Sequence, residues 1–460
     1  MILAAPHSTW DEAEDFLLGE PREKFGFFLC GIAQARNGPR FCVQEFFSVE
    51  DEHLEGGFET GRQVDLDFLL EVINRAKEDG LAVVEVHTHP HTGDNVTFST
   101  IDDREMTDFV SYTMDSLDGR PYAAVVLGHE SLDARYWEEP DEHSPVERVV
   151  IAGKKFDHRI PTSSPLNQSG EPVVSDRYDR QVRFLGEPGQ HRLGQLRVGV
   201  VGAGGIGSHV IQQLAYLGVR EFKLIDPDTI EESNLNRTVG VYPWDVGLPK
   251  VAMAERLVQQ IGADEDVEVM TLQEDLQSAA AIRFLLETDI IVGCVDNDGA
   301  RQLLNELSRV GHVPYVDVAT GIEVSNGDLV QMGGRTAVVQ PDGLCLHCMK
   351  EIDRDEARYF LKSPEEREED REAGYTDEMW EIPNPSVVSL NGVIASTAAN
   401  KILMYATGDD SVAPLLYHYV REPGSESQRL ARRRDEQDAE CYTCSLGGIG
   451  DRADLERYTR

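Results

Sequence analysis

Residues 200–210 read VVGAGGIGSHV, and this stretch decides the fold of the larger part of the chain. An apolar strand runs into a glycine-rich turn, and the turn opens a helix. The turn contains four glycines, Gly202, Gly204, Gly205 and Gly207. Glycines at this spacing let the backbone approach a phosphate group at the helix N-terminus. Asp226 ends the next expected strand about 20 residues later, where a carboxylate can bind ribose hydroxyls. By itself, the pattern is typical of a nicotinamide-dependent dehydrogenase.

The sequence around this turn predicts an α/β chain with two domains. From about residue 176, the strand-like runs RVGVVG, EFKLID, DIIVGCVDN and PYVDV alternate with helical patterns. Such alternation predicts a Rossmann-like, mostly parallel sheet with helices on both faces, here over residues 176–450. Residues 1–150 have an α/β pattern of their own. Residues 151–175 are rich in proline, serine and glycine and lack periodicity, which predicts a linker.

The composition excludes several classes of partner. The 460 residues include 83 acidic and 43 basic side chains, so the formal net charge is −40. A surface of this charge repels phosphate backbones, and we expect no nucleic-acid partner. The chain has no run of about 18 uncharged apolar residues, so we expect no membrane span. Its start lacks the basic and apolar regions of a signal peptide, which predicts a cytoplasmic location.

A second motif lies in residues 87–102, which read HTHPHTGDNVTFSTID. His87 and His89 alternate on an expected strand and therefore point to one face. Together with Asp102, at the start of a helix, they can supply three zinc ligands and leave a fourth position open for water. Ser99 can donate a hydrogen bond to a developing oxyanion. The motif predicts a catalytic zinc site, whereas two strand histidines alone are more often structural.

The segments HTHP and STID, separated by a loop, resemble the JAB/MPN (JAMM) metallopeptidases. The resemblance implies that residues 1–150 form a JAB/MPN domain that cleaves peptide or isopeptide bonds after ubiquitin-like tails. It also implies that Glu23, in the segment EKFGFFLCG, is the general base. Glu85 competes for that role because it alternates with the two histidines on the expected strand. The loop after Pro90 is two residues longer than the family's pattern.

The segments DRYDRQ, DPDTIEESNLNR, GLPK and CVDND flank the glycine-rich turn in this order. They resemble ThiF/MoeB-type adenylyltransferases, the superfamily of ubiquitin-activating enzymes. The resemblance implies binding of ATP with Mg²⁺ and places phosphate-contacting cations at Arg237 and Lys250. It implies a homodimer, because Arg180 matches an arginine that reaches into the neighbouring subunit's site. Thr238 departs from the family, which usually has glutamine after the Asn-Arg pair.

The same resemblance assigns the acidic and amide side chains around the nucleotide. It implies that Asp226 binds the ribose hydroxyls and that Asp228 and Asn234 lie near the ribose and the phosphates. Asp296 matches the aspartate that holds Mg²⁺ or orients the attacking carboxylate. Negative charge builds on the phosphates during adenylation, so cations must be positioned there in advance. A dehydrogenase has no need for such a set of cations.

Two CxxC pairs predict a structural zinc site. The four cysteines are Cys345, Cys348, Cys441 and Cys444. Four thiolates arranged as two such pairs are typical of a tetrahedral, closed zinc site, and the ThiF/MoeB resemblance implies the same site. Bound zinc would attach the C-terminal segment to the segment after residue 344.

The segment after the first CxxC pair, residues 351–386, contains no cysteine. Ubiquitin-activating enzymes that form a thioester carry their nucleophile there. We expect direct transfer of the acyl-adenylate to an external acceptor, with Ser363 or Thr376 as an alternative hydroxyl nucleophile. Cys294, at the end of an expected strand, is interpreted as a packing residue. The charge run in this segment predicts a mobile, solvated loop.

The sequence therefore predicts a bifunctional enzyme of a ubiquitin-like protein system. The C-terminal domain would adenylate the terminal glycine of a small β-grasp protein, and the N-terminal domain would cleave bonds formed after that glycine. The first alternative is sulfur-carrier activation for cofactor or cysteine synthesis. The second is an NAD-dependent oxidoreductase with an accessory metal domain, and the third is a non-catalytic scaffold.

Overall fold

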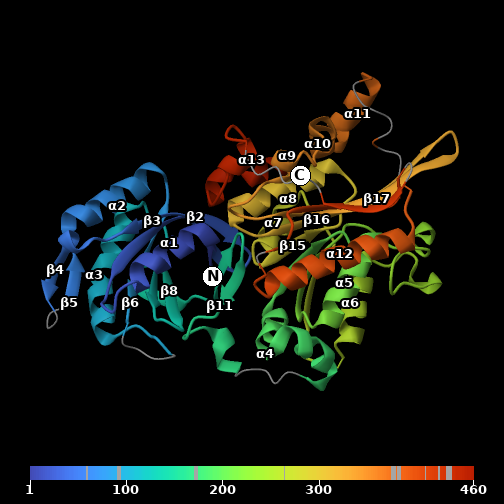
Figure 1. Ribbon diagram of the computed structural model, residues 1–460. Coiled ribbons are helices and arrows are strands. Elements are labelled where there is room, and N and C mark those ends of the chain that lie inside the picture. Colours follow the sequence, from blue (N-terminus) through green and yellow to red (C-terminus); the bar gives the residue numbers. More distant parts are fainter. Residues whose placement is uncertain are drawn as a thin grey trace.

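The computed structural model describes residues 1–57, 61–90, 95–169, 175–263, 265–374, 380, 385–409, 411–422, 425–430 and 438–459. The chain forms two bodies that lie side by side, each built around its own large β-sheet (Figure 1). The mixed α/β fold agrees with the sequence analysis.

The N-terminal sheet has nine strands in the order β11-β10-β1-β3-β2-β6-β7-β8-β9. The strands are β1 (Ile2–Pro6), β2 (Phe25–Ala35), β3 (Gly38–Ser48), β6 (Ala82–Thr88), β7 (Tyr122–Leu127), β8 (Leu132–Glu139), β9 (Glu142–Pro145), β10 (Arg148–Ala152) and β11 (Phe156–Arg159). β6 pairs antiparallel with β2 and parallel with β7, so it lies inside the sheet. A separate hairpin is formed by β4 (Leu54–Gly57) and β5 (Gly61–Val64).

Helices cover both faces of the N-terminal sheet. They are α1 (His7–Leu18), α2 (Leu66–Glu78) and α3 (Thr100–Ser116). α1 buries Trp10 and Leu17 in the core on one face, and α2 and α3 bury Val72 and Val110 in the core on the other. Ser99 caps α3 by accepting hydrogen bonds from the first backbone N–H groups of the helix. This cap fixes where the helix starts, directly beside the end of β6.

The linker predicted over residues 151–175 starts too early. β11 pairs antiparallel with β10 and extends the N-terminal sheet to Arg159. Phe156 and His158 are buried and alternate with half-buried neighbours, which is the pattern of a short edge strand. β11 has only one large apolar residue, Phe156, among its four residues. The sequence therefore shows no clear strand pattern beside the proline- and serine-rich segment that follows.

The C-terminal sheet has eight strands in the order β14-β13-β12-β15-β16-β17-β18-β19. The strands are β12 (Arg197–Val201), β13 (Glu221–Ile225), β14 (Glu268–Leu272), β15 (Ile290–Gly293), β16 (Tyr315–Ser325), β17 (Asp328–Val339), β18 (Leu415–Glu422) and β19 (Ser425–Leu430). The strands from β14 to β16 are parallel, as predicted. From β16 to β19 the sheet is antiparallel, which the sequence analysis did not predict.

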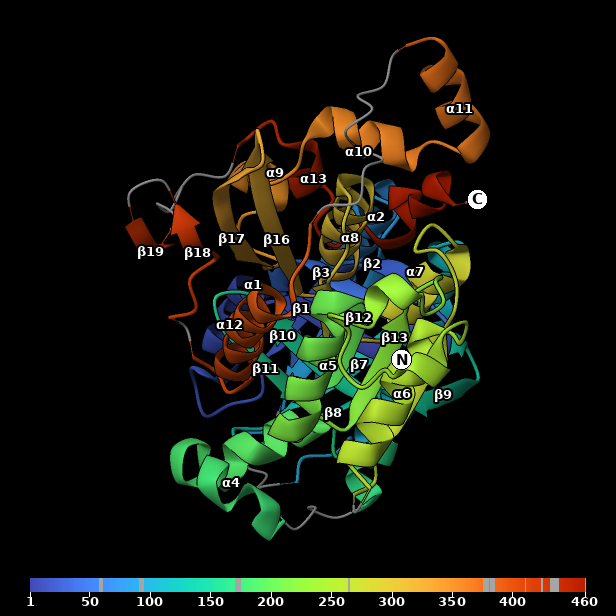
Figure 2. The same ribbon diagram turned by 90° about the vertical axis from the view of Figure 1, so that its right-hand side faces the viewer.

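Helices cover both faces of this sheet too, as the alternating pattern predicted (Figure 2). They are α4 (Asp179–Gln195), α5 (Gly205–Leu217), α6 (Lys250–Ile261), α7 (Ala279–Leu285), α8 (Asp298–Gly311), α9 (Leu346–Met349), α10 (Arg354–Leu361), α11 (Pro364–Glu372), α12 (Val388–Ala406) and α13 (Tyr442–Ser445). α4, α5, α6 and α12 share one core, and α7 and α8 belong to the other. α10 and α11 lie in the segment predicted as a mobile loop, and that prediction is wrong for these residues.

A buried arginine joins the two bodies. Arg40, on β3, is fully buried and donates hydrogen bonds to the carbonyl oxygens of Gly311 at 2.6 Å, Leu286 at 3.0 Å and Thr288 at 3.1 Å. His312 forms a 2.8 Å hydrogen bond with the carbonyl oxygen of Val43 in the opposite direction. Backbone carbonyls of the C-terminal body therefore accept the hydrogen bonds of a buried guanidinium from the N-terminal body. A buried cation needs such partners, so the two bodies are held in one relative position.

The end of the chain returns to the N-terminal body. The side chain of Gln44, on β3, donates a 2.8 Å hydrogen bond to the carbonyl oxygen of Gly448. A Cβ atom on Gly31, in β2, would lie 2.1 Å from that same oxygen, so only glycine permits this approach.

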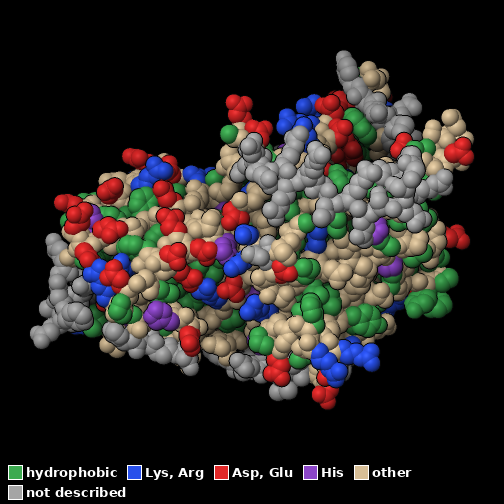
Figure 3. Space-filling view, viewed as in Figure 1, with side chains coloured by type: hydrophobic (Ala, Val, Ile, Leu, Met, Phe, Trp, Pro, Cys, Tyr) green, Lys and Arg blue, Asp and Glu red, His purple; other side chains and the backbone are tan. Residues whose placement is uncertain are grey.

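Among the described residues, no helix is both long and apolar enough to cross a membrane. Acidic side chains are spread over the N-terminal half in the view of Figure 3.

Candidate active sites

The glycine-rich turn has the geometry of a phosphate-binding turn. Gly202 has a φ of +90°, and its N–H donates a 2.8 Å hydrogen bond to the carbonyl oxygen of Ile225 on the neighbouring strand. A Cβ atom on Gly207 would lie 1.8 Å from the carbonyl oxygen of Gly202. Gly207 therefore serves the close packing of helix against strand, and Gly204 and Gly205 lie where α5 begins.

A cavity of about 590 Å³ opens beside this turn, at the carboxyl ends of the parallel strands. This volume and position are typical of a ligand site in an open α/β sheet. Most of the predicted nucleotide-site residues line it: Gly202, Gly204, Gly205, Asp226, Asp228, Asn234, Arg237, Lys250 and Asp296. Arg180 is exposed on α4 and lies outside the described lining of this cavity.

Asp226 is bound to the backbone of the turn. Its carboxylate accepts hydrogen bonds from the N–H groups of Ala203 at 2.7 Å and Asp228 at 2.9 Å. Burial raises the pKa of Asp226, and the cation of Lys250 partly offsets this effect. The carboxylate thus fixes the turn and also lies at the cavity wall. Its contact with ribose stays a prediction.

Two cations, Lys250 and Arg237, line the cavity. The ammonium group of Lys250 donates a 2.7 Å hydrogen bond to Asp228 and lies 4.0 Å from Asp226. The guanidinium of Arg237 donates to the carbonyl oxygen of Ser233 and, at 3.3 Å, to the side chain of Asn236. Asn234 accepts a 3.0 Å hydrogen bond from the N–H of Glu231, which shapes the same loop.

The sequence analysis missed part of the cavity wall. Asp317, at the end of the parallel region of β16, lies 3.3 Å from the guanidinium of Arg301 and 3.1 Å from that of Arg335. Arg301 and Arg335 line the cavity, and Glu356 and Arg367 close it from α10 and α11. The position of Asp317 at the carboxyl end of the PYVDV strand was the one sequence signal for this cluster. Glu356 and Arg367 were not predicted, because they lie in the highly charged α10–α11 segment.

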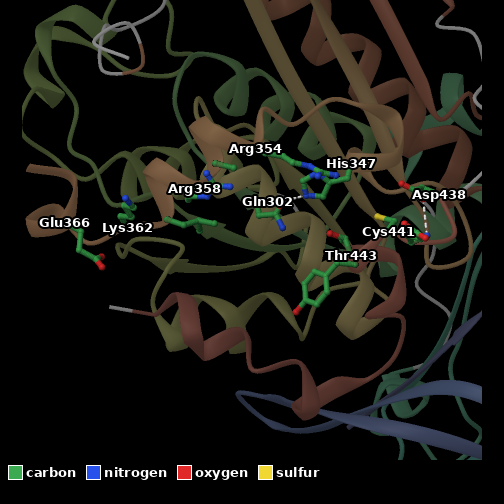
Figure 4. Close-up of a pocket in the computed structure, with 13 residues that line it drawn as sticks. Gln302, His347, Arg354, Arg358, Lys362, Glu366, Asp438, Cys441 and Thr443 are labelled. Carbon is green, nitrogen blue, oxygen red and sulfur yellow. Dashed lines mark hydrogen bonds between the residues drawn. The ribbon is translucent and has the colours of Figure 1, made fainter. Parts of the chain in front are cut away.

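A second cavity, of about 580 Å³, lies on the opposite side of α10. Arg354, Arg358 and Lys362 line it from the side of α10, and Cys441 and Thr443 line it from the C-terminal segment (Figure 4). This cavity lacks the glycine-rich turn. α10 is therefore a wall shared by two cavities, and only the first has the features expected for a nucleotide.

The four cysteines of the CxxC pairs come together in space. The sulfur atoms of Cys345 and Cys441 are 3.6 Å apart, as are those of Cys348 and Cys444. Four sulfurs placed about 2.3 Å from one zinc ion have nearly this separation. The guanidinium of Arg309 lies 3.4 Å from the sulfur of Cys444 and stabilises its thiolate form. These residues fit a structural zinc ion.

The histidines of the N-terminal motif also form a cluster. Glu23, His87 and His89 present ligand atoms that all lie within 4.8 Å of one another. Asp102 places its carboxylate oxygens 3.6 Å from His87 Nε2 and 3.5 Å from His89 Nε2. Both ring nitrogens of His87, Nδ1 and Nε2, are buried and have no hydrogen-bond partner in this structure. An orphaned ring nitrogen that faces a carboxylate and a second imidazole fits a metal ion. The loop residues 91–94 lie outside the described part of the chain.

Two carboxylates control the charge of the buried His87 imidazole. Burial lowers the pKa of His87, but the carboxylates of Asp102 and Glu85 outweigh it and raise that pKa to about 9. Burial raises the pKa of Asp102, but His87 and the N–H of Ser99 hold it well below its usual range. The Ser99 hydroxyl accepts 3.2 Å hydrogen bonds from the N–H groups of Ile101 and Asp102.

Glu85 lies on the other side of His87. Its Oε1 atom is 3.3 Å from His87 Nδ1, and its Oε2 atom accepts a 2.9 Å hydrogen bond from the hydroxyl of Tyr122. The histidine ring thus separates Glu85 from Asp102, which lies nearest to Nε2. Of the two candidate bases, Glu23 is the one whose carboxylate lies near the ring nitrogens of both His87 and His89.

The alternative nucleophiles are poorly placed. Cys294 lines the nucleotide cavity, but burial raises the pKa of its thiol well above the ordinary value. Ser363 accepts a hydrogen bond from the N–H of Glu366 as the cap of α11, and it lies outside the described cavity lining. Thr376 lies outside the described residues.

Comparisons with known proteins cover the C-terminal body. Residues 178–444, more than half of the chain, match the model of the ThiF family, and residues 1–150 lie outside this match. The SAMP-activating enzyme E1 of Haloferax volcanii is 29% identical over 290 residues, which are 61% of this chain and 93% of that protein. The family match over residues 178–444 includes the glycine-rich turn, both cations and both cysteine pairs.

Two bacterial proteins show a shorter similarity. The sulfur carrier protein adenylyltransferase of Thermus thermophilus is 33% identical over 182 residues, which are 38% of this chain and 63% of that protein. The sulfur carrier protein ThiS adenylyltransferase of Bacillus subtilis is 32% identical over 181 residues, which are 38% of this chain and 51% of that protein. The chain thus spans less than two thirds of the length of these two relatives.

Proposed function

Because the chain belongs to the ThiF family, we propose that residues 176–450 use ATP to adenylate the C-terminal carboxylate of a small ubiquitin-like or sulfur-carrier protein. The observation that carries this proposal is the joint placement of the glycine-rich turn, Arg237 and Lys250 around one cavity. A nicotinamide dinucleotide needs the turn but not the two cations. The presence of both cations beside the turn therefore favours ATP over the dinucleotide.

In this reaction, a carboxylate oxygen of the partner protein attacks the α-phosphorus of ATP. The bond between that phosphorus and the bridging oxygen breaks, and pyrophosphate leaves with its electron pair. Arg237 and Lys250 neutralise the charge that builds on the phosphates, and Asp296 holds Mg²⁺ or orients the attacking carboxylate. Most of the catalysis comes from this positioning, because the protein forms no covalent bond in the step.

The acyl group then passes directly from the adenylate to an external acceptor, and AMP leaves as the bond between the acyl carbon and the phosphate oxygen breaks. Residues 351–386 lack a cysteine, and the thiol of Cys294 has a raised pKa that disfavours the reactive thiolate. Ser363 is engaged as a helix cap. Both a sulfur donor, giving a thiocarboxylate, and an amine acceptor, giving a conjugate, are compatible with this route.

The adenylation proposal is tested by ATP–pyrophosphate exchange with a small β-grasp protein that ends in glycine. Lys250→Ala and Arg237→Ala should each lower the exchange rate by at least about 100-fold, the scale seen when one group that stabilises transition-state charge is removed. Lys155→Ala is the control, because Lys155 is exposed and does not line the cavity. Full exchange in both variants, or tight NAD binding without ATP turnover, would refute the proposal.

We also propose that Arg180 completes the site of a second copy of the chain. Arg180 is exposed and does not line its own subunit's described cavity. Four residues further along α4, the side chain of Phe184 is 75% exposed, and Tyr216 at the end of α5 is 56% exposed. Large exposed apolar side chains next to a functional cation are typical of a protein–protein interface. A homodimer would cover them.

A second function is favoured by the N-terminal cluster. We propose that His87, His89 and Asp102 hold a catalytic zinc ion and that residues 1–150 act as a JAB/MPN-type peptidase on the same small protein. Bound zinc lowers the pKa of water. Glu23 takes a proton from the attacking water and transfers it to the leaving amine as the C–N bond breaks. Ser99 donates a hydrogen bond to the carbonyl oxygen.

The peptidase proposal is tested with a linear fusion of the small protein to a reporter, joined after its terminal glycine. Glu23→Gln should abolish cleavage and leave the zinc content unchanged, since Glu23 is assigned as base rather than ligand. His89→Ala should remove both the N-terminal zinc and the cleavage. Cleavage by the Glu23→Gln variant, or chelator-resistant cleavage by the native protein, would refute this assignment.

A further inference from the structure

We infer that Glu85, fixed by Tyr122, is a positioning residue that orients His87 toward a metal ion. The inference rests on the proposed N-terminal zinc site. It assigns to Glu85 a role different from that of a general base, and it gives Tyr122 a function.

The strand geometry places these groups together. Glu85 and His87 are two residues apart on β6, so their side chains lie on the same face of the sheet. β7 is the parallel neighbour of β6, with Glu85 opposite Ala124, and it supplies Tyr122 from its first position. Tyr122 is only 1% exposed, and its hydroxyl donates a 2.9 Å hydrogen bond to Glu85 Oε2. A buried tyrosine hydroxyl thus fixes one carboxylate oxygen.

The other carboxylate oxygen faces the histidine. Glu85 Oε1 lies 3.3 Å from His87 Nδ1, an ion-pair distance that falls short of regular hydrogen-bond geometry. The Phe25 ring stacks on His87 with ring centres 5.6 Å apart, and the Phe98 ring meets it edge-on at 6.0 Å. These rings offer no acceptor to Nδ1. The carboxylate of Glu85 is therefore the partner that this environment provides.

The chemical consequence concerns the position of the ring proton. A neutral imidazole carries its proton on one nitrogen and a lone pair on the other. A carboxylate that accepts from the Nδ1 proton leaves the lone pair on Nε2, the atom that faces Asp102 and His89. Residues that orient metal-binding histidines in this way also raise the basicity of the ligand, and their loss typically costs about 10–100-fold in metal affinity.

The test measures zinc affinity by competition with a chromogenic chelator, with the four-cysteine site already loaded. Glu85→Ala should weaken zinc binding at the N-terminal site by about 10–100-fold. Glu85→Gln should lose less, because its amide oxygen can still accept from Nδ1. Tyr122→Phe should show an intermediate loss, since it releases the carboxylate without removing it. This graded order separates positioning from a general loss of stability.

The control is Tyr178→Phe, which removes a comparable 2.8 Å hydrogen bond from a buried tyrosine to Glu265 in the C-terminal body. It should leave the zinc affinity unchanged. Cobalt(II) absorption distinguishes the two sites, because only thiolate ligands give intense sulfur-to-metal charge-transfer bands. Native affinity in Glu85→Ala, with two metal ions bound, would overturn the positioning role alone. A native protein that binds metal only through its thiolates would overturn the peptidase proposal as well.

Discussion

At the residue scale, single atoms decide whether the nucleotide turn can form. Alanine normally stabilises a helix interior by about 1 kcal/mol relative to glycine. At Gly207 this preference is outweighed, because an added Cβ would lie 1.8 Å from the carbonyl oxygen of Gly202 and 3.4 Å from the Cβ of Cys294. The first contact is with backbone, which cannot rotate away. Helix and strand would therefore have to separate.

We accordingly expect Gly207→Ala to abolish ATP binding and to lower the free energy of unfolding by about 1–3 kcal/mol, the usual cost of overpacking. Isothermal titration calorimetry measures the first effect and denaturant unfolding the second. Gly321→Ala is the control, because Gly321 is exposed on β16 and an added Cβ meets nothing within 4 Å. ATP binding by Gly207→Ala with native affinity would contradict the role given to this glycine.

At the scale of elements, the spacing of apolar residues predicted the central strands and helices of the C-terminal sheet. It did not predict the antiparallel strands or the charged helices. The apolar run ending at Val201, the glycines after it and Asp226 predicted β12, α5 and β13, because local spacing alone determines this unit. β17–β19 were missed because antiparallel pairing depends on distant partners. α10 and α11 were missed because their helical faces are highly charged. Most of the predicted nucleotide-site residues nevertheless line one cavity, because the strand ends place them at one edge of the sheet.

An element-scale prediction concerns the end of α8, where His312 contacts β3. Burial lowers the pKa of His312 to about 4, compared with an ordinary value of 6.5. The unfolded chain binds more protons between these values, so stability should fall as the pH drops from 6.5 to 4, by about 3 kcal/mol at most. His312→Asn should flatten this slope, and Asn tolerates the positive φ of 49° at this position.

The slope is measured by denaturant unfolding at several pH values between 4 and 7. His129→Asn provides the control, because His129 is exposed and should leave the slope as it is in the native protein. The same pH dependence in native protein and His312→Asn would show that other groups control acid stability.

At the scale of the whole molecule, the proposed dimer makes two inactive variants complementary. Arg180→Ala would remove the cation supplied to the partner, and Lys250→Ala would remove a cation from the subunit's own site. In a mixed dimer, one of the two sites has native Lys250 and receives native Arg180. We expect each variant alone to be inactive in pyrophosphate exchange and a mixture, after subunit exchange, to regain part of the activity.

The same experiment has a clear negative outcome. If Arg180 acts within its own subunit, mixing the two variants restores nothing, because every site then lacks one cation. A protein that is monomeric in analytical ultracentrifugation and fully active in exchange would exclude the dimer model altogether.

The return of the last residues to the first sheet has a consequence for dissecting the enzyme. Gly448 lies against β2 and β3, and it follows shortly after Cys441 and Cys444, whose sulfur atoms lie beside those of Cys345 and Cys348 in the second body. A recombinant fragment that ends after the N-terminal sheet would therefore lack the residues around Gly448. It would expose β2 to solvent at Gly31. Testing the two proposed activities separately will need point variants, since the polypeptide crosses the boundary twice.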